Sequence, residues 1–279
     1  MAPAADAGTI TLGDLTVNRM GYGAMRITGP GIWGDPPDPE ASKGVLRRTL
    51  ELGVNFIDTA SAYEASERLI GEALAPYSDG VVVASKAGLY RTGPGEWPID
   101  SSPEAIRRQT EQSLRALRVE RIDLHQLHRP DPKVPIEESV GALKELQDEG
   151  KIRHIGVSNV TVDLLRRAQS VAPIVSVQNQ YNVGDRASED VLEVCETEGL
   201  AFLPWHPLSA GALAQTGGQL DEVAHKHDAT PVQVALAWLL HRSPAILVIP
   251  GTNSLEHLEE NVAAASLRLD DDDVSLLSG

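Results

Sequence analysis

The chain has 279 residues, 42% of them hydrophobic and 23% charged, so it is long enough for one large α/β domain spanning residues 1–279. Its net charge of −16 argues against a nucleic-acid partner, because duplex binding needs a cationic face. No apolar run approaches the roughly 20 residues that cross a bilayer, and residues 1–6 lack the charged start and apolar core of a signal peptide, so we expect a cytoplasmic protein with no membrane partner.

Short apolar runs that predict strands alternate with helical patterns along most of the chain. After a predicted hairpin between Thr9 and Val17, strands are expected to begin near Asn18, Asn55, Val81, Ile122, His154, Ile174, Ala201 and Ile246. Alternating strands and helices are typical of βα units around a parallel sheet, and eight-stranded barrels need about 250 residues. We therefore predict an α/β fold, a (β/α)8 TIM barrel with an N-terminal β-hairpin.

The predicted helices carry recognisable end signals. Capping side chains stand before three helix starts, at Ser102, Ser188 and Thr230, and the helix after Thr230 places Trp238 on its apolar face, so Trp238 is expected in the core. Glycines able to adopt the left-handed C-terminal conformation stand where helices pass to strands, at positions 53, 150 and 199.

Other architectures and site types find less support in the sequence. An open doubly wound sheet would carry a glycine-rich fingerprint after its first strand, but Gly21 to Arg26 lacks the third glycine, and no acid follows about 20 residues later at a strand end. Cys195, the one cysteine, is expected to be a small buried hydrophobe. The run Asp270–Asp273 is expected to be a solvated helix entry rather than a cation site, and no metal is assigned.

Four polar side chains stand at or just after the ends of predicted strands: Asp58, Tyr63, Lys86 and His128. The carboxyl ends of parallel barrel strands meet on one face, so these side chains are expected to cluster. A tyrosine with a pKa of about 10 is a poor acid near neutrality, but an ammonium about 4 Å away stabilises the phenolate by roughly 4 kcal/mol at a dielectric of about 20, or about three pKa units. Lys86 would supply that charge, Asp58 would hold Lys86 protonated, and His128 would donate to a substrate carbonyl or relay a proton. Each side chain also has a structural explanation, such as an ion pair, rim packing or a strand end.

Short motifs follow one another over nearly the whole chain: Gly21-Tyr22-Gly23, Phe56-Ile57-Asp58 with Tyr63, Ser85-Lys86, Gln126-Leu127-His128-Arg129-Pro130, Gly156-Val157-Ser158-Asn159, Gln178-Asn179-Gln180-Tyr181-Asn182 and Pro250-Gly251-Thr252. In this order they resemble those of the aldo-keto reductase superfamily. The resemblance implies a (β/α)8 barrel, a nicotinamide cofactor bound without a Rossmann fold, and a catalytic tetrad formed by Asp58, Tyr63, Lys86 and His128. It also implies reversible NADPH-dependent reduction of an aldehyde or ketone to the alcohol.

The resemblance assigns further residues to the cofactor. Gly23, Ala24, Met25 and Asp58 would border it, Ser158, Asn159 and Gln178 would hydrogen-bond the nicotinamide carboxamide, and Trp205 would stack on the nicotinamide ring. The loop with His206, Pro207, Leu208 and Gly211 would pass along the pyrophosphate. The adenosine end would be surrounded by Pro250, Gly251, Thr252, Asn253, His257, Glu260 and Asn261.

The residues expected at the 2′-phosphate of the cofactor differ from those of the best-known relatives. Those that clamp the 2′-phosphate often have a lysine and an arginine where this chain has Gly251 and His257. Backbone donors of the turn 251–254, at the start of a helix predicted over Ser254–Ala265, could still bind the phosphate. NADPH (NADP+) is therefore the expected cofactor, and use of NADH stays open.

The predicted partner is a small-molecule carbonyl substrate, and the oligomeric state stays open. Its predicted contacts are Met25, Trp33, Tyr63, Tyr90, Trp97 and His128. Segments 21–25, 27–34 and 230–240 resemble a bacterial branch that includes pyridoxal reductases, so pyridoxal is a specific candidate. Two other classes stay open: a barrel aldolase that uses Lys86 as a Schiff-base nucleophile, although Asp58 would keep that amine protonated, and a cofactor-binding redox-sensing module without significant turnover.

Overall fold

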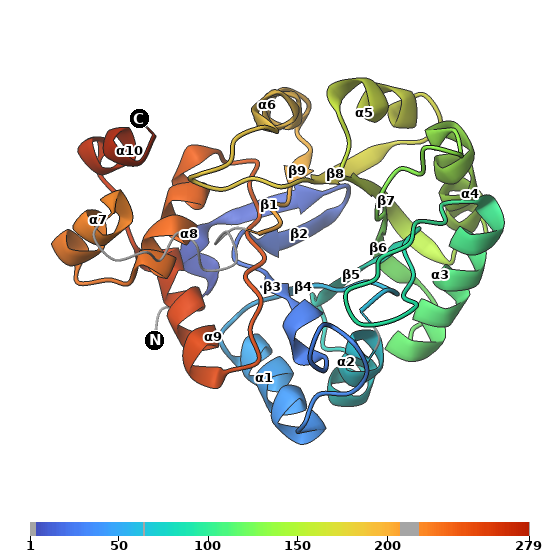
Figure 1. The fold of residues 1–279 in the computed structure, drawn as a ribbon, viewed down its shortest axis with the longest axis horizontal. Helices are drawn as coiled ribbons and strands as arrows, with labels where there is room; N and C mark the ends of the chain where they lie inside the picture. The colour runs from blue at the N-terminus through green and yellow to red at the C-terminus, as the bar shows by residue number, and fades with distance from the viewer. Residues whose placement is uncertain (1–3, 64, 207–217, 279) are drawn as a thin grey trace.

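A curled parallel sheet surrounded by helices forms the body of the protein (Figure 1). This computed structural model describes residues 4–63, 65–206 and 218–278. Within them, seven strands pair in chain order: β3 (Tyr22–Gly23), β4 (Phe56–Asp58), β5 (Val82–Ala87), β6 (Ile122–Leu127), β7 (Ile152–Ser158), β8 (Ile174–Gln178) and β9 (Ala201–Phe202). Parallel bridges from Phe202 to Ile246 and from Met20 to Val248 close the sheet into the predicted (β/α)8 barrel.

The first and last barrel strands differ from the prediction. Asn18 ends the hairpin formed by β1 (Thr9–Leu12) and β2 (Leu15–Asn18), and its side-chain amide is held by the carbonyl of Gly53 at 2.7 Å. The first barrel strand therefore begins only at Tyr22. The segment near Ile246 contributes isolated bridges, because Pro244 and Pro250 at its two ends lack the N–H groups that would extend a ladder.

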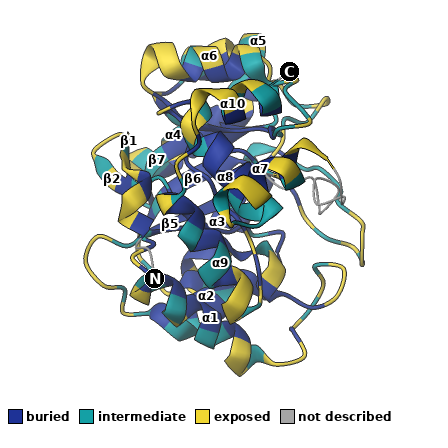
Figure 2. Ribbon diagram, turned by 90° about the vertical axis from the view of Figure 1, so that its left-hand side faces the viewer, coloured by how far each residue is buried: buried dark blue, intermediate teal, exposed yellow. Residues whose placement is uncertain are grey.

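Helices cover the outside of the sheet, with exposed faces outward and buried faces toward the strands (Figure 2). They are α1 (Pro39–Glu51), α2 (Ser66–Leu74), α3 (Pro103–Leu117), α4 (Ile136–Asp148), α5 (Val162–Gln169), α6 (Glu189–Glu198), α7 (Gln219–His227), α8 (Pro231–Arg242), α9 (Leu255–Ala263) and α10 (Asp271–Ser278), with 3-10 turns η1 (Ala4–Ala7), η2 (Ala24–Ile27) and η4 (Ala264–Ser266). None of these helices is long and apolar enough to cross a membrane.

The helix ends follow the predicted signals in most places. Ser102 caps α3, and Thr230 with Gln233 forms a complete capping box on α8. The glycines at 53, 150 and 199 all have positive φ, as predicted for helix C-termini. Ser188 differs, because its hydroxyl accepts a hydrogen bond from the Asn179 side chain at 3.3 Å and makes no cap on α6.

The core divides into two clusters because strand side chains alternate between the inside and the outside of the barrel. The larger cluster lies between strands and helices and includes Trp238 and Cys195, both buried as predicted. The smaller cluster fills the barrel interior, where Leu12 and Val17 of the hairpin meet Phe56 and other inward residues of the strands. The hairpin therefore closes the amino-terminal end of the barrel and leaves the carboxyl-terminal end open for a site.

The acidic run Asp270–Asp273 is a helix entry, although it is less solvated than predicted. The backbone N–H of Asp273 donates to Asp270 Oδ1 at 2.9 Å, and the Asp270 N–H donates to Asp273 Oδ2 at 3.0 Å. Asp273 is buried, since its carboxylate also pairs with Lys226 at 2.7 Å and His227 at 2.6 Å. Among the residues that the structure describes, no group of three or more His, Cys, Asp or Glu could hold a metal ion.

Candidate active site

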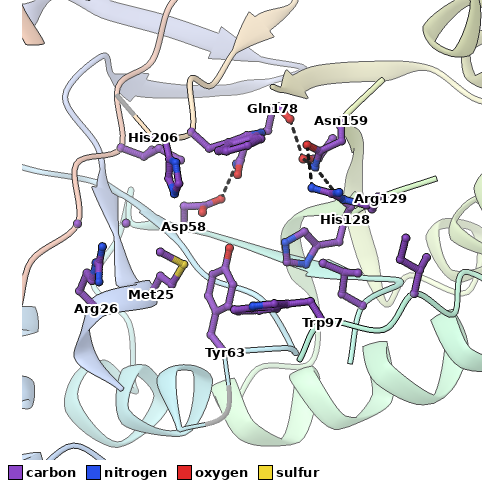
Figure 3. Close-up of a pocket in the computed structure, with 17 residues that line it drawn as sticks. Met25, Arg26, Asp58, Tyr63, Trp97, His128, Arg129, Asn159, Gln178 and His206 are labelled. Atoms are coloured by element: carbon purple, nitrogen blue, oxygen red, sulfur yellow. Dashed lines mark hydrogen bonds between the residues drawn. The ribbon is translucent and has the colours of Figure 1, made fainter. Parts of the chain in front are cut away.

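A cavity of about 500 Å³ opens at the carboxyl ends of the barrel strands (Figure 3). Its lining comes from the ends of β3, β4, β6, β7 and β8 and from the loops that follow them. The lining residues are Gly23, Met25, Arg26, Asp58, Tyr63, Leu89, Trp97, Ile99, His128, Arg129, Ser158, Asn159, Gln178, Trp205, His206, Ile249 and Gly251. This volume lies in the range of small-molecule sites.

Strand alternation places the polar groups at the floor of this cavity. Residues two apart on a strand share a face. The apolar interior residues Phe56, Ala84 and Leu124 are therefore followed, two positions later on the same inner face, by the polar residues Asp58, Lys86 and Gln126. Gly156 makes room for this layer, because a Cβ there would lie 2.9 Å from the Gln126 side chain and 2.2 Å from Ser176 Oγ. The barrel is therefore apolar at the hairpin end and polar at the cavity end.

Asp58 and Lys86 form a buried ion pair directly beneath the cavity. Lys86 Nζ lies 2.6 Å from Asp58 Oδ2 and 2.9 Å from the Thr59 carbonyl oxygen, and the side chains are 0% and 4% exposed respectively. The other carboxylate oxygen accepts from the amides of Gln178 at 3.0 Å and Gln126 at 3.4 Å. Burial lowers the pKa of Lys86 and the Asp58 charge opposes that shift, so the ammonium depends on its partner.

Tyr63 stands above this pair on the loop after β4. The Lys86 ammonium lies 5.4 Å from the centre of its ring, and the ring meets His128 and Trp97 edge to face at 5.7 Å and 6.3 Å. Burial raises the pKa of Tyr63 well above 10, and the Asp58 charge raises it further. The predicted net lowering of this pKa is therefore wrong in this structure, because burial outweighs the stabilisation that the Lys86 ammonium gives to the phenolate. Tyr63 is a neutral phenol that holds a proton to donate.

His128 is a neutral imidazole that lines the cavity beside Tyr63, with the two ring centres 5.7 Å apart. Burial lowers its pKa well below 6.5, and the charges of Lys86 and Arg129 lower it further. Its backbone is held on both sides, since its N–H donates to Ala87 O at 2.8 Å and its carbonyl accepts from Asn159 Nδ2 at 3.0 Å. Its Nδ1 is buried and has no hydrogen-bond partner among the described residues. A neutral imidazole in this position can donate one N–H to an oxygen in the cavity but carries no charge.

An amide and aromatic surface lies beside these groups. Asn159 has a left-handed φ of 60°, and its side-chain amide donates to Ser158 Oγ at 2.9 Å, while Ser158 Oγ donates to the Gln178 carbonyl at 2.6 Å. Trp205 lines the same cavity, and its buried indole N–H has no partner among the described residues. These groups fit a flat ligand with a carboxamide, because they offer amide oxygens for its N–H groups and an aromatic ring for its face.

Comparison with known proteins identifies the family of this barrel. Residues 19–279 match the model of the aldo/keto reductase family. The chain belongs to this family. This aldo/keto reductase is 51% identical over 268 residues to an uncharacterized oxidoreductase of Schizosaccharomyces pombe, covering 95% of this chain and 87% of that one. It is 42% identical over 282 residues to the pyridoxine 4-dehydrogenase of Escherichia coli, covering 98% of each chain.

Solved structures of the family share the fold. The aldo/keto reductase from Klebsiella pneumoniae in complex with NADP and acetate matches this chain with a TM-score of 0.82 at 29% identity, over 96% of this chain and 93% of that one. The expected superfamily and barrel are therefore confirmed, and the enzyme is an oxidoreductase. Lys86 does not line the cavity of this reductase, so its amine is not placed to attack a bound carbonyl.

Twelve of the predicted site residues of the reductase meet in the cavity. They are Gly23, Met25, Asp58, Tyr63, Trp97, His128, Ser158, Asn159, Gln178, Trp205, His206 and Gly251. Ala24 is buried and does not line the cavity. Pro250, Thr252 and Asn253 lie in the segment before α9, His257, Glu260 and Asn261 lie within α9, and none of these six lines the cavity. Pro207, Leu208 and Gly211 lie outside the described residues.

Trp33 and Tyr90 do not line the cavity, unlike the other predicted substrate contacts. Trp33 lies 5.7 Å from the guanidinium of Arg91, which stacks on Trp97 at 3.8 Å, so Trp33 supports the wall from outside. Tyr90 is exposed, and its backbone N–H donates to the Pro98 carbonyl at 3.1 Å. The Glu260 carboxylate, predicted to lie near the adenosine, accepts a hydrogen bond from Thr230 at 2.5 Å at the start of α8.

Six residues of this part of the structure were not assigned a role by the sequence: Arg26, Leu89, Ile99, Gln126, Arg129 and Ile249. Gln126 occupies the inward position between Leu124 and His128, so strand alternation alone could have placed it beneath the cavity. Arg26 directly follows Met25, which was predicted to contact both cofactor and substrate. Leu89, Ile99 and Ile249 reach the cavity through loop geometry that has no local sequence signal.

Proposed function

We propose that this aldo/keto reductase transfers hydride reversibly between NADPH and a small aldehyde or ketone, with Tyr63 as the proton donor. The observation that carries the proposal is the meeting of Tyr63 and His128 at 5.7 Å in one cavity, directly above the buried Lys86–Asp58 pair. The NADP complex of the Klebsiella pneumoniae relative supports the choice of cofactor. Ser158, Asn159, Gln178 and Trp205 would hold the nicotinamide.

Four residues of the chain have separate roles in the proposed reaction. When bound, NADPH supplies a hydride to the carbonyl carbon. His128 donates an N–H hydrogen bond to the carbonyl oxygen and so orients it toward Tyr63. Tyr63 transfers its phenolic proton to that oxygen as negative charge develops there, and the nearby Lys86 ammonium stabilises the phenolate that remains. Asp58 keeps Lys86 protonated in its buried position and fixes its direction.

Pyridoxal is the specific substrate we propose within this class. The 42% identical relative from Escherichia coli is a pyridoxine 4-dehydrogenase. The substrate side of the cavity offers a flat aromatic wall, Trp97, together with the apolar side chains of Leu89 and Ile99. An aromatic aldehyde could stack on Trp97 while its carbonyl reaches Tyr63, because those two rings are 6.3 Å apart.

Turnover with a small carbonyl panel tests the proposal. The wild-type enzyme is incubated with NADPH or NADH and with pyridoxal, benzaldehyde or a short aliphatic aldehyde, and cofactor oxidation is followed by absorbance at the nicotinamide band. We expect oxidation of NADPH with the highest kcat/KM for pyridoxal. Cofactor binding without turnover on any carbonyl would instead support the redox-sensing module, and borohydride trapping of a carbonyl compound on Lys86 would support the aldolase.

A further inference from the structure

Arg26 is a positively charged residue that lines the cavity, and the proposed reaction gives it no role. It follows β3 in the turn η2, and it lines the cavity at the end away from Trp97 and Arg129 (Figure 3). Its side chain is exposed and forms no hydrogen bond or ion pair with any other described residue. Since the chain carries a net charge of −16, a free guanidinium at this place makes a local site for an anion.

The neighbours of Arg26 keep this end of the cavity open. A Cβ on Gly251 would lie 2.6 Å from the Gly23 carbonyl oxygen and 3.7 Å from Arg26 Cγ, so the stem of Arg26 runs close to the bare backbone of Gly251. His206 lines the same end, and burial together with the Arg26 charge lowers its pKa. His206 is therefore neutral near pH 7, and the positive charge at this end comes from Arg26.

Two long segments of the sequence provide no other cation. Neither residues 187–225 nor residues 243–267 contain a lysine or arginine. Lys226, which follows the first segment, is paired with Asp270 at 2.6 Å and Asp273 at 2.7 Å on the outside of the barrel. Among the described residues, an anionic group at this end of the cavity would meet the backbone of Gly23 and Gly251, the imidazole of His206 and the guanidinium of Arg26.

We propose that Arg26 binds the diphosphate of the nicotinamide cofactor through its guanidinium. This inference rests on the proposed function. The diphosphate is the phosphate group nearest to the nicotinamide in the cofactor, and Arg26 shares one cavity with Trp205 and directly follows Met25. The 2′-phosphate lies at the far end of the cofactor, where Asn253 and His257 are expected, and neither of these residues lines the cavity. A planar guanidinium can contact two phosphate oxygens at once.

Cofactor affinity of an Arg26→Gln variant tests this assignment without relying on turnover. Dissociation constants for NADPH and NADH are measured from the quenching of tryptophan fluorescence at two salt concentrations, with displacement titrations for the weaker ligand. We expect both cofactors to bind about 10- to 100-fold more weakly, which corresponds to about 1.5–3 kcal/mol for a hydrogen bond between charged groups. The salt dependence of binding should flatten, and Arg26→Lys should restore part of the affinity.

Arg47→Gln is the matched control, because Arg47 is exposed on the outer face of α1 and its loss changes the net charge equally. It should bind both cofactors like the wild type, and thermal unfolding should show that all variants fold. Unchanged affinity in Arg26→Gln would overturn the inference, and a loss confined to NADPH would overturn the diphosphate assignment in favour of the 2′-phosphate. A wild-type enzyme that neither binds NADPH nor reduces an aldehyde would instead refute the proposed function.

Discussion

Glu67 should make the stability of the enzyme depend on pH between about pH 4.5 and pH 7. Glu67 is 5% exposed, and its carboxyl lies between α2 and β5, where it accepts a hydrogen bond from Ser85 Oγ at 2.5 Å. Burial raises the pKa of Glu67 from 4.5 to about 7. The folded protein therefore retains a proton that the unfolded chain has already lost. Stability is greatest below the unfolded pKa and falls as the pH rises to about 7, after which it stays constant.

The size of this effect follows from the shift. A pKa shift of about 2.5 units corresponds to about 3 kcal/mol, since one unit equals about 1.4 kcal/mol. Glu67→Gln keeps the size and the hydrogen-bonding oxygen but carries no charge. The variant should therefore be more stable than the wild type by about 3 kcal/mol at pH 8 and by less than about 1 kcal/mol at pH 5.

Urea unfolding followed by tryptophan fluorescence at pH 5, 6, 7 and 8 measures this difference. Glu193→Gln on α6 is the control, because Glu193 is exposed and its substitution removes the same charge without the burial. Its stability relative to the wild type should change little with pH. A Glu67→Gln gain that is equal at pH 5 and pH 8 would refute the reasoning, because a pH-independent gain comes from packing and not from a titrating carboxyl.

The remaining predictions concern the site itself. Lys86→Met should destabilise the protein by about 3–5 kcal/mol, because it leaves the Asp58 carboxylate buried without its partner, and adding Asp58→Asn should recover part of that loss in urea unfolding. Additive losses in the double variant would contradict the account of the ion pair. Trp97→Leu should raise KM for pyridoxal about 2- to 10-fold and leave the NADPH dissociation constant unchanged, since an aromatic contact contributes about 0.5–1.5 kcal/mol. An unchanged KM would show that Trp97 does not contact the substrate. Because burial holds the pKa of Tyr63 well above 10, the rate of carbonyl reduction at saturating substrate should be flat from about pH 6 to 9. A fall governed by an apparent pKa near 7 in that profile would argue against a neutral Tyr63 as the donor.

Much of the cavity floor was predictable because it depends on strand alternation. Once β4, β5 and β6 are recognised, the period of two places Asp58, Lys86 and Gln126 on the inner face at the same end of the barrel. The barrel itself followed from the spacing of apolar runs, and the resemblance to a known family added the residues of β7 and β8.

Other features needed the three-dimensional structure because they depend on burial and on distant neighbours. The direction of the Tyr63 pKa shift is set by burial and, to a smaller extent, by the charge of Asp58, and local sequence reveals neither effect. Arg26 has no distinctive sequence context, and its position becomes clear only beside Gly251, more than two hundred residues away in the chain. Trp33 reads like a substrate contact, yet Arg91 lies between it and Trp97.

Single-turnover kinetics of Tyr63→Phe test the central claim most directly. Wild-type and variant enzymes preloaded with NADPH are mixed with pyridoxal, and the loss of dihydronicotinamide absorbance is followed in a stopped-flow instrument, with cofactor affinity measured in parallel. We predict that the variant binds NADPH like the wild type, since the phenolic oxygen donates to no described residue, but transfers hydride about 10²- to 10⁴-fold more slowly for lack of its proton donor. A variant that reduces pyridoxal at the wild-type rate would contradict the assignment of Tyr63 as the acid.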